Sequence, residues 1–385
     1  MHLKRTKRLL AGHLWVFSNE ISENLRQYEQ GSLVEVCDMH DNFMGKGYIN
    51  PQSLISVRLL TRENEEINRD FFRRRIEDAI TLRQNLLGKR DAVRLVYSEG
   101  DYLPGLIVDR YANCLVLQFL TAGMESFRDT VIEILDELIN PETIILRNES
   151  RIRTLEGVPL YKEVVKGDLR NMPIINEEGI LFEIDPYEGQ KTGFFLDQRE
   201  NRTLLKKYIR GGKGLDLFCY IGAWSMHLAS AGAEVTGVDA SERAVIQAQK
   251  IANMNNFSER LSFVKDDVFS FLETELASGE KRLDFIVLDP PAFVKSAGKI
   301  KEAVKAYREL NERCMRLLKT GGILATASCS YHLSGDLFID MLHSASRNAR
   351  RGVRLIEMRS QGPDHPVLLS VPETEYLKCA FLLVD

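Results

Sequence analysis

Short apolar runs separated by turn residues characterise the first part of the chain. They favour β-strands, because the strands of small β domains are bounded by Gly, Pro, Asn and Asp. We expect strands at residues 32–37, 43–49 and 54–60. Helical spacing follows at 70–88 and 124–139, and further strands are expected at 93–97, 105–109, 114–120 and 143–147. The pattern predicts a small β-rich domain over residues 1–68 and a small α+β domain over residues 69–176.

From about residue 213 nearly uncharged strands alternate with helical patterns. The strands are expected at 214–218, 234–238, 261–264, 284–288 and 322–326. This alternation is typical of α/β proteins, in which helices cover both faces of a parallel sheet. We therefore predict an α/β domain over residues 177–385, with its ligand site at the carboxyl ends of the strands.

Composition narrows the class of protein. The chain has 385 residues, of which 44% are hydrophobic and 28% charged, which is ordinary for a soluble globular protein and excludes a disordered one. No stretch approaches the ~20 apolar residues of a membrane span, and the basic start lacks the apolar core of a signal peptide, so we expect a cytoplasmic protein. The six cysteines include no Cys-x-x-Cys pair, so no metal site is expected.

Basic residues are unevenly spread, although the chain carries 51 Lys and Arg against 55 Asp and Glu. Three segments have an excess of basic side chains: 191–213, 295–319 and 347–359. If these segments share a face, they form a local surface for phosphate groups. The alternative is that each is a solvated helix face with no partner.

A candidate cofactor site follows the first strand of the α/β domain. Gly222 stands in the turn before the next helix, where a glycine lets a ligand approach the backbone. Asp239 ends the next strand, 17 residues later, and its carboxylate can accept hydrogen bonds from ribose hydroxyls. Asp267 follows the third strand and can bind an adenine amino group. These positions favour a nucleoside ligand, and an ordinary tight turn at Gly222 is the alternative.

The sequence of the same turn distinguishes between two kinds of nucleoside cofactor. A dinucleotide site uses Gly-x-Gly-x-x-Gly so that backbone can touch the pyrophosphate, but only Gly222 stands in this loop. S-adenosylmethionine has ribose and adenine without phosphate, and it fits better. Lys191 and Gln198 lie just upstream and are candidate cofactor contacts, while a helix N-terminus capped by Asp197 is the plainer interpretation of that segment. The remaining residues that we predict to bind the cofactor are Asp216, Phe218 and Asp289.

The fourth strand of the α/β domain runs into Asp289-Pro290-Pro291-Ala292-Phe293. The two prolines stiffen the loop where the strand enters the ligand crevice, and Phe293 offers an aromatic face on which a flipped RNA base can stack. Enzymes that methylate exocyclic base amines carry Asn or Asp before Pro-Pro and an aromatic residue here, so the motif fits both amine and carbon methylation. A rigid surface loop is the alternative.

Cys329 distinguishes between these two reactions. It stands just past the fifth strand and therefore faces the same crevice as Asp289. Carbon 5 of a pyrimidine is a poor nucleophile, but a thiolate that adds to carbon 6 turns it into an enamine-like carbanion. Asp289, protonated or sharing a proton, would stabilise the charge that reaches ring nitrogen 3. We predict Cys329 and Asp289 as catalytic residues, and a buried structural cysteine is the alternative.

Six motifs spread over the chain are similar to those of one known family. They are Gly-His-Leu-Trp-Val-Phe-Ser at 12–18, Gly-Gln-Lys-Thr-Gly-Phe-Phe-Leu-Asp-Gln-Arg at 189–199, Asp-Leu-Phe-Cys-Tyr-Ile-Gly at 216–222, Asp-Pro-Pro-Ala-Phe at 289–293, Ser-Cys-Ser at 328–330 and Asp-His-Pro at 364–366. Together they resemble the bacterial large-subunit ribosomal RNA methyltransferase I type, whose members are S-adenosylmethionine-dependent cytosine-C5 methyltransferases. The resemblance implies an N-terminal PUA domain (an RNA-binding β-barrel), a small α+β domain and a Rossmann-like class I methyltransferase domain. It also implies that Cys329 is the nucleophile.

One departure concerns the wider class of cytosine-C5 methyltransferases. Many of them carry Pro-Cys after the fourth-strand Asp, whereas Pro290-Pro291 stands here. No second cysteine is therefore available at this point to assist product release, and the base that removes the carbon-5 proton is not identified. The target cytosine does not follow from the resemblance either.

The N-terminal β domain carries features of an RNA-binding surface. Trp15 offers base stacking, and Arg5 and Arg8 offer phosphate contacts. Core aromatic residues beside a frayed basic tail are the alternative, and we expect Trp15 to be partly buried. The sequence thus predicts a cytosine-C5 methyltransferase of large-subunit ribosomal RNA, for which a homodimer is one conceivable assembly. A methyltransferase of exocyclic base amines and a non-catalytic RNA-binding assembly protein are the alternatives.

Overall fold

The computed structural model describes residues 1–279, 283–293, 298 and 300–385. The chain forms two compact units. The N-terminal unit comprises Met1–Glu177, Glu183–Leu196 and Pro363–Thr374, and the C-terminal unit comprises Glu178–Phe182, Asp197–Gly362 and Glu375–Asp385. The strands β11 (Ile174–Glu177) and β12 (Ile180–Glu183) lie where the chain passes from one unit to the other.

A five-stranded sheet forms the first part of the N-terminal unit. Its order is β1-β3-β4-β5-β2, and its strands are β1 (His2–Leu3), β2 (Trp15–Phe17), β3 (Leu33–Asp38), β4 (Phe43–Ile49) and β5 (Ile55–Thr61). Gly47 allows β4 and β5 to approach closely, because a Cβ at this position would lie 2.1 Å from the Arg58 carbonyl oxygen. The three strands predicted between residues 32 and 60 are confirmed to within one residue.

A second five-stranded sheet, of order β10-β9-β8-β7-β6, completes this unit. Its strands are β6 (Ala92–Tyr97), β7 (Leu106–Tyr111), β8 (Cys114–Phe119), β9 (Thr143–Asn148) and β10 (Tyr161–Lys166), and its helices are α2 (Arg69–Leu87), α3 (Ala122–Ser126), α4 (Arg128–Ile139) and α5 (Arg151–Leu155). Residues of α2, α4 and the sheet share one apolar core that includes Phe72, Ile134 and Leu117. The edge strand β10 was not predicted, because all six of its residues are half-buried and show no alternation.

Buried polar contacts join the two sheets of the N-terminal unit. The Tyr48 hydroxyl on β4 donates to the Pro104 carbonyl oxygen at 2.7 Å, and the Arg58 guanidinium on β5 pairs with the buried Glu156 at 2.9 Å. The first sheet therefore packs against the α+β part within one compact unit. The boundary that we predict at residue 68 stays a prediction.

The late Asp-His-Pro motif also belongs to the N-terminal unit. The Asp364 carboxylate accepts a hydrogen bond from the Arg94 backbone N–H at 3.1 Å, and Arg83 donates to the Asp364 carbonyl oxygen at 2.8 Å. Asp364 and His365 are buried and hydrogen-bonded to each other. Within this unit the motif is a buried structural element of the fold.

The C-terminal unit is built on a seven-stranded sheet of order β15-β14-β13-β16-β17-β19-β18. Its strands are β13 (Lys213–Leu217), β14 (Glu234–Asp239), β15 (Leu261–Lys265), β16 (Leu283–Leu288), β17 (Leu318–Ser328), β18 (Val353–Arg359) and β19 (Lys378–Val384). The first five strands in this order are parallel, as predicted. β18 and β19 were not predicted, and β19 runs antiparallel between β17 and β18.

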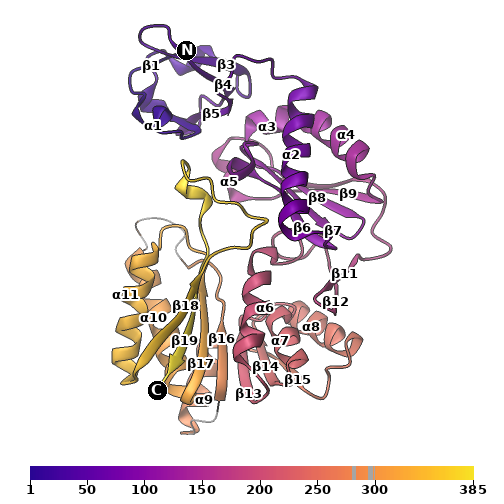
Figure 1. The fold of residues 1–385 in the computed structure, drawn as a ribbon, viewed down its shortest axis with the longest axis vertical. Helices are drawn as coiled ribbons and strands as arrows, with labels where there is room; N and C mark the ends of the chain where they lie inside the picture. The colour runs from indigo at the N-terminus through magenta and orange to yellow at the C-terminus, as the bar shows by residue number, and fades with distance from the viewer. Residues whose placement is uncertain (280–282, 294–297, 299) are drawn as a thin grey trace. The chain divides into compact units, whose positions relative to one another are not determined.

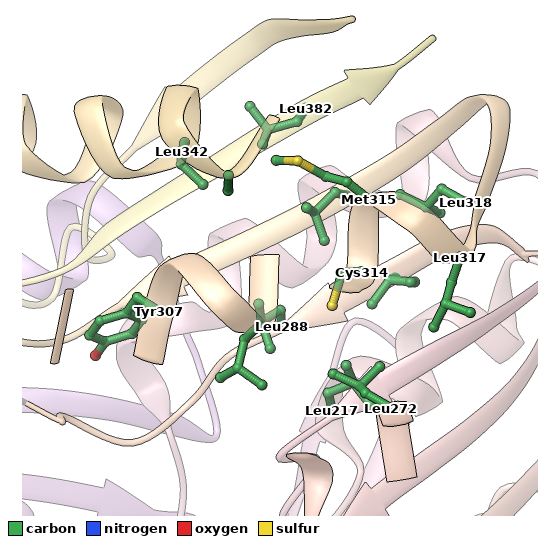
Figure 2. Packing of buried hydrophobic residues seen from close by; sticks show 14 of the residues in the cluster. Leu217, Leu272, Leu288, Tyr307, Cys314, Met315, Leu317, Leu318, Leu342 and Leu382 are labelled. Carbon is green, nitrogen blue, oxygen red and sulfur yellow. The ribbon is translucent and has the colours of Figure 1, made fainter. Parts of the chain in front are cut away.

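Helices cover this sheet, and Figure 1 shows α10 and α11 beside its β17–β18 part. They are α6 (Arg199–Tyr208), α7 (Ala223–Ser230), α8 (Glu242–Met254), α9 (Val268–Ala277), α10 (Ile300–Leu317) and α11 (Gly335–Ala349). Figure 2 shows how α10 contributes Tyr307, Cys314 and Met315 to a core that also contains Leu288 of β16 and Leu382 of β19. This packing fixes α10 against the strands that carry the reactive motifs.

No helix among the described residues combines the length and the apolar character needed to cross a bilayer. Within the same residues, no group of three or more His, Cys, Asp or Glu side chains is arranged to hold a metal ion.

Candidate active site

The turn between β13 and α7 has an unusual backbone. Phe218, Tyr220 and Gly222 have φ values of 63°, 50° and 75°, so two non-glycine residues adopt the left-handed conformation. Such residues cost about 1–3 kcal/mol each and persist where the surrounding structure holds them, often at ligand sites. Gly222 is also required sterically, because a Cβ there would lie 2.9 Å from the Phe263 ring. The turn is thus a preformed and strained loop at the carboxyl end of the central strand.

Asp239 holds this turn from the neighbouring strand β14. Its Oδ2 accepts a hydrogen bond from the Tyr220 backbone N–H at 2.9 Å, and its Oδ1 accepts one from the Ser241 N–H at 2.9 Å. The carboxylate is half-buried beside the turn. Asp267 is exposed and caps α9 by accepting from the Ser270 N–H at 3.1 Å. For both residues the contact with a cofactor stays a prediction.

Asp216 is fully buried in the middle of β13. Its Oδ2 accepts hydrogen bonds from the Ser225 backbone N–H at 3.0 Å and from the Ser225 hydroxyl at 2.7 Å, which ties β13 to α7. Its Oδ1 has no hydrogen-bond partner among the described residues. Burial, with Asp289 and Asp239 nearby, raises the pKa of Asp216 to about 7. The side chain therefore acts first by positioning α7, and direct contact with the cofactor stays a prediction.

The raised pKa predicts how the stability of the C-terminal unit depends on pH. A carboxyl group whose pKa rises from 3.8 to about 7 on folding stabilises the fold below pH 3.8, and this contribution is lost as the pH rises towards 7. The contribution of this one carboxyl group to the free energy of unfolding is at most about 4 kcal/mol. Asp216→Asn cannot ionise, so we expect it to remove most of this decline between pH 4 and 8.

Tryptophan fluorescence can measure this effect in the C-terminal unit alone. The chain has two tryptophans, and Trp15→Phe leaves Trp224 as the single reporter. Urea unfolding of this variant with and without Asp216→Asn gives the pH dependence, and Asp266→Asn is the exposed control. Equal declines with and without Asp216→Asn would contradict a buried, protonated Asp216.

Asp289 lies immediately after β16 and is held by two N–H donors. The Gln198 side-chain amide and the Trp224 indole N–H both donate to its Oδ2, each at 3.1 Å. Gln198 and Trp224 are buried, so the carboxyl group has a fixed orientation. The structure thus brings together the predicted residues Gln198 and Asp289. Trp224 was missed, although its place in the first turn of α7, directly after Gly222, is a signal that could have found it.

Cys329 follows the last residue of β17 and is half-buried. The Tyr307 hydroxyl of α10 lies 3.0 Å from the Ser330 hydroxyl and donates to the Pro291 carbonyl oxygen at 3.4 Å. Tyr307 is fully buried and therefore ties the turn that contains Cys329 to the loop that follows Asp289. Sequence reasoning missed Tyr307, because its helical spacing indicated only a core position.

Two aromatic residues of the predicted site pack against the core. The Phe293 ring centre lies 4.8 Å from that of Tyr307 and 6.3 Å from that of Phe218. Both Phe293 and Phe218 are partly buried beside the core of the C-terminal unit. Phe293 is thus held in an aromatic cluster, and its contact with an RNA base stays a prediction.

Asp197 does not cap the following helix. The helix α6 begins after Gln198, which makes no side-chain capping bond, and the Asp197 carboxylate accepts a hydrogen bond from the Tyr376 hydroxyl at 2.5 Å. The plainer alternative, a cap at Asp197, was wrong, because the chain makes a short 3₁₀ turn over Leu196–Gln198 before α6 begins.

Other predicted residues belong to the N-terminal unit. The Lys191 ammonium lies 4.4 Å from the centre of the Phe195 ring, and the exposed Arg8 guanidinium lies 4.4 Å from the centre of the Phe17 ring. Arg5 is exposed, and Trp15 is half-buried, as expected, with its indole N–H donating to Glu99 at 2.8 Å. Their contacts with the cofactor or with RNA stay predictions.

The basic segment 191–213 is not a solvated face over its whole length. Arg199 is 3% exposed and Arg202 is 1% exposed, so both guanidinium groups lie inside the fold. A phosphate-binding surface cannot include them. Part of the second segment, residues 295–297 and 299, lies outside the described residues.

The geometry can be compared with known proteins. A family model described as S-adenosylmethionine-dependent methyltransferase matches residues 161–374, more than half of the chain. The chain belongs to this methyltransferase family. A model described as PUA-like domain matches residues 1–62. These matches confirm the predicted cofactor, S-adenosylmethionine, and the predicted fold class, a Rossmann-like class I methyltransferase domain preceded by a PUA-like domain.

Full-length relatives of this methyltransferase carry the name that the motifs suggested. The chain is 36% identical over 383 residues to "Ribosomal RNA large subunit methyltransferase I" of Pseudoalteromonas atlantica, covering 98% of this chain and 97% of that protein. It is 38% identical over 381 residues to the protein of the same name from Shewanella frigidimarina, covering 97% and 96%. The resemblance to this family is thus confirmed.

Two solved structures share the fold of this methyltransferase over almost their whole length. One is a methyltransferase, SMU.776, complexed with SAH, with a TM-score of 0.86 and 20% identity over 100% of this chain and 99% of that one. The other is a methyltransferase from Streptococcus mutans, with a TM-score of 0.85, 21% identity and the same coverage. At this identity the likeness shows the fold alone.

The residues of the turn fit the family's cofactor. S-adenosylmethionine carries a ribose, an adenine and a positively charged sulfonium, and it supplies an electrophilic methyl group. Asp239 offers a carboxylate beside the turn, and Asp216 offers a buried oxygen without a hydrogen-bond partner in the described part of the chain. The half-buried Asp239 carboxylate beside this turn suits a cationic nucleoside.

Proposed function

We propose that this methyltransferase transfers a methyl group to carbon 5 of a cytosine in large-subunit ribosomal RNA, with Cys329 as a covalent nucleophile. The observation that carries the proposal is the position of Cys329. It is half-buried directly after β17, and the parallel neighbour strand β16 leads into Asp289. A thiol and a carboxyl group at adjacent strand ends can reach the two sides of one pyrimidine ring.

Ribosomal RNA as the substrate is supported by the names of the relatives at 36% and 38% identity. The PUA-like domain at residues 1–62 supports an RNA partner as well. On this domain Arg5 and Arg8 are exposed, and their charges can contact phosphates without reading sequence. We therefore assign substrate capture to the N-terminal unit and chemistry to the C-terminal unit.

The proposed reaction begins with the Cys329 thiolate. Its sulfur forms a bond to carbon 6, and the electrons of the C5–C6 double bond move to carbon 5 and, by conjugation, to nitrogen 3. Carbon 5 is then nucleophilic enough to accept the methyl group that S-adenosylmethionine would supply, with the electrons of the broken methyl–sulfur bond remaining on the cofactor sulfur. A base removes the carbon-5 proton, the electrons of that C–H bond restore the C5–C6 double bond, and the S–C6 bond breaks to release the thiolate.

Asp289 stabilises the charge on the ring in this scheme. Its Oδ2 accepts the N–H groups of Gln198 and Trp224, and we assign a proton shared with the substrate to Oδ1. That proton can be donated towards nitrogen 3 while negative charge accumulates there. Gln198 and Trp224 orient the carboxyl group, and Tyr307 holds the loop after Asp289 against the turn that contains Cys329.

The nature of the product tests the proposal. Purified protein is incubated with S-adenosylmethionine and with ribosomal RNA from a strain that lacks it, and the digested nucleosides are identified by mass spectrometry. We expect 5-methylcytidine at one position of large-subunit RNA. An N-methylated base would contradict the proposal in favour of exocyclic-amine methylation. Tight cofactor binding without methyl transfer to any ribosomal RNA would favour a non-catalytic assembly protein.

A further inference from the structure

A buried lysine lies beside the turn that contains Cys329. Lys378 is the first residue of β19 and pairs directly with Ser328, the last residue of β17. It is only 9% exposed. Its Nζ donates to the Ser330 carbonyl oxygen and to the Tyr376 carbonyl oxygen, each at 2.8 Å. Lys378 is therefore held to the residues on both sides of the cysteine. Its backbone pairs with Ser328, and its ammonium group donates a hydrogen bond to Ser330.

The surroundings of Lys378 leave its positive charge available to the thiol. Both of its hydrogen bonds go to neutral carbonyl groups, and in the described part of the chain no carboxylate lies within 4 Å of Nζ. Burial lowers its pKa to about 8, while the negative charges of Cys329 and Glu375 act against this change. A buried cation without a carboxylate partner is costly, so such a group is a candidate for a functional role.

We propose that Lys378 is a positioning residue that keeps Cys329 ionised by placing a buried positive charge beside its sulfur. The inference deepens the proposed function and rests on Cys329 being the nucleophile. In this ionisation the Cys329 thiol loses its proton to water and becomes a thiolate, while Lys378 keeps its three N–H bonds. The attraction between the two charges stabilises both charged forms.

The thiolate matters because only this form attacks carbon 6. An ordinary cysteine has a pKa near ~8.5 and is mostly protonated at pH 7, and a neighbouring ammonium lowers that pKa. The other cysteines of the C-terminal unit lie in the opposite environment, since burial raises the pKa of Cys219, Cys314 and Cys379. Lys378 thus distinguishes the turn at Cys329 from every other cysteine site of this unit.

Other ionisable groups also face this turn from the elements packed around it. The Tyr307 phenol of α10 interacts with Cys329, Glu375 precedes β19 and interacts with Lys378, and Asp289 ends the neighbouring strand β16. A negative charge on either carboxyl group would disfavour a thiolate. Among these described groups Lys378 is the positively charged one, and we attribute the ionisation of Cys329 to it.

The pH dependence of alkylation measures the ionisation of Cys329 directly. Iodoacetamide is applied to the full-length protein without RNA or cofactor, and peptide mass spectrometry follows Cys329 separately from the other cysteines. Lys378→Gln keeps a donor for the carbonyl groups but removes the charge, whereas Lys378→Arg keeps both. Lys319→Gln, at the other end of β17 and more exposed, is the matched control.

We expect the midpoint of alkylation to rise by about one pH unit or more in Lys378→Gln, with a several-fold slower reaction at pH 7. Lys378→Arg and Lys319→Gln should resemble the wild type. A merely structural lysine would give the same midpoint in Lys378→Gln as in the wild type, and this result would overturn the inference. If Lys378→Gln does not fold, a wild-type Cys329 midpoint at or above 8.5 overturns it equally.

The readout is independent of the proposed reaction. If Cys329→Ala retained methyl transfer, the proposed nucleophile would be wrong, whatever the alkylation midpoints of the Lys378 variants. If Cys329→Ala abolishes transfer but the midpoint does not move, Lys378 alone is assigned wrongly.

Discussion

Cys329→Ala is expected to abolish methyl transfer, with a loss of roughly 10⁴-fold or more in kcat. The reason is chemical, because without the sulfur no bond to carbon 6 can form and carbon 5 remains a poor nucleophile. The variant should also fail to form a covalent complex with RNA that contains 5-fluorocytidine, in which fluorine replaces the carbon-5 proton and elimination of the cysteine is blocked. Gel mobility under denaturing conditions detects this complex in the wild type.

The variant should otherwise behave as the wild type. Cys329 is half-buried at a strand end and removing its sulfur leaves no large cavity, so we expect the same cofactor affinity and melting temperature. Cys37→Ala, which alters a half-buried cysteine of the PUA-like domain, is the matched control. It should retain both methyl transfer and formation of the covalent complex. Methylation that persists in Cys329→Ala would leave exocyclic-amine chemistry at Asp289 as the better account.

The strands around the cofactor turn could be predicted because burial on both faces leaves a local signature. β13, β14 and β16 are short, largely apolar and bounded by turn residues, so their positions follow from neighbouring residues alone. β18 and β19 lack that advantage. β18 lies at the edge with Leu355 and Ile356 exposed, and the antiparallel pairing of β19 with β17 depends on contacts far apart in sequence.

The candidate site likewise contains residues that the sequence predicted and residues that it did not. Gly222, Asp239, Asp289 and Cys329 were predicted as site residues because the carboxyl ends of parallel strands meet at one edge of a sheet. Trp224, Tyr307 and Lys378 were not found, since their roles depend on side-chain packing or strand register. The pairing of Lys378 with Ser328, for example, exists only because β19 inserts between β17 and β18.

Burial also explains where charge patterns misled. Arg199 and Arg202 belong to a basic run, and net charge alone suggested a surface for phosphates. In the fold both arginines lie on the inward side of α6. Spacing along a helix decides whether a basic residue faces solvent, and a count of charges in a window carries no such information.

Asp289→Asn is expected to give the second largest loss of activity, and its size separates the two candidate reactions. Asparagine can still accept the N–H groups of Gln198 and Trp224, so the side chain should stay in place. In carbon-5 methylation it can no longer share a proton with ring nitrogen 3, and kcat should fall by about 10²- to 10⁴-fold. KM for the RNA and the cofactor affinity should change much less.

Exocyclic-amine methylation predicts a milder result for the same variant. Enzymes that methylate exocyclic base amines use Asn as well as Asp before Pro-Pro, so in that reaction most of the activity would remain. Asp284→Asn is the matched control, because Asp284 lies on the same strand β16 at the end away from the site, where its carboxylate accepts from the Lys213 N–H at 2.8 Å. The decisive result is a kcat for Asp289→Asn within tenfold of the wild type while Asp284→Asn keeps full activity. This result would count against a proton held by Asp289 and therefore against the proposed carbon-5 mechanism.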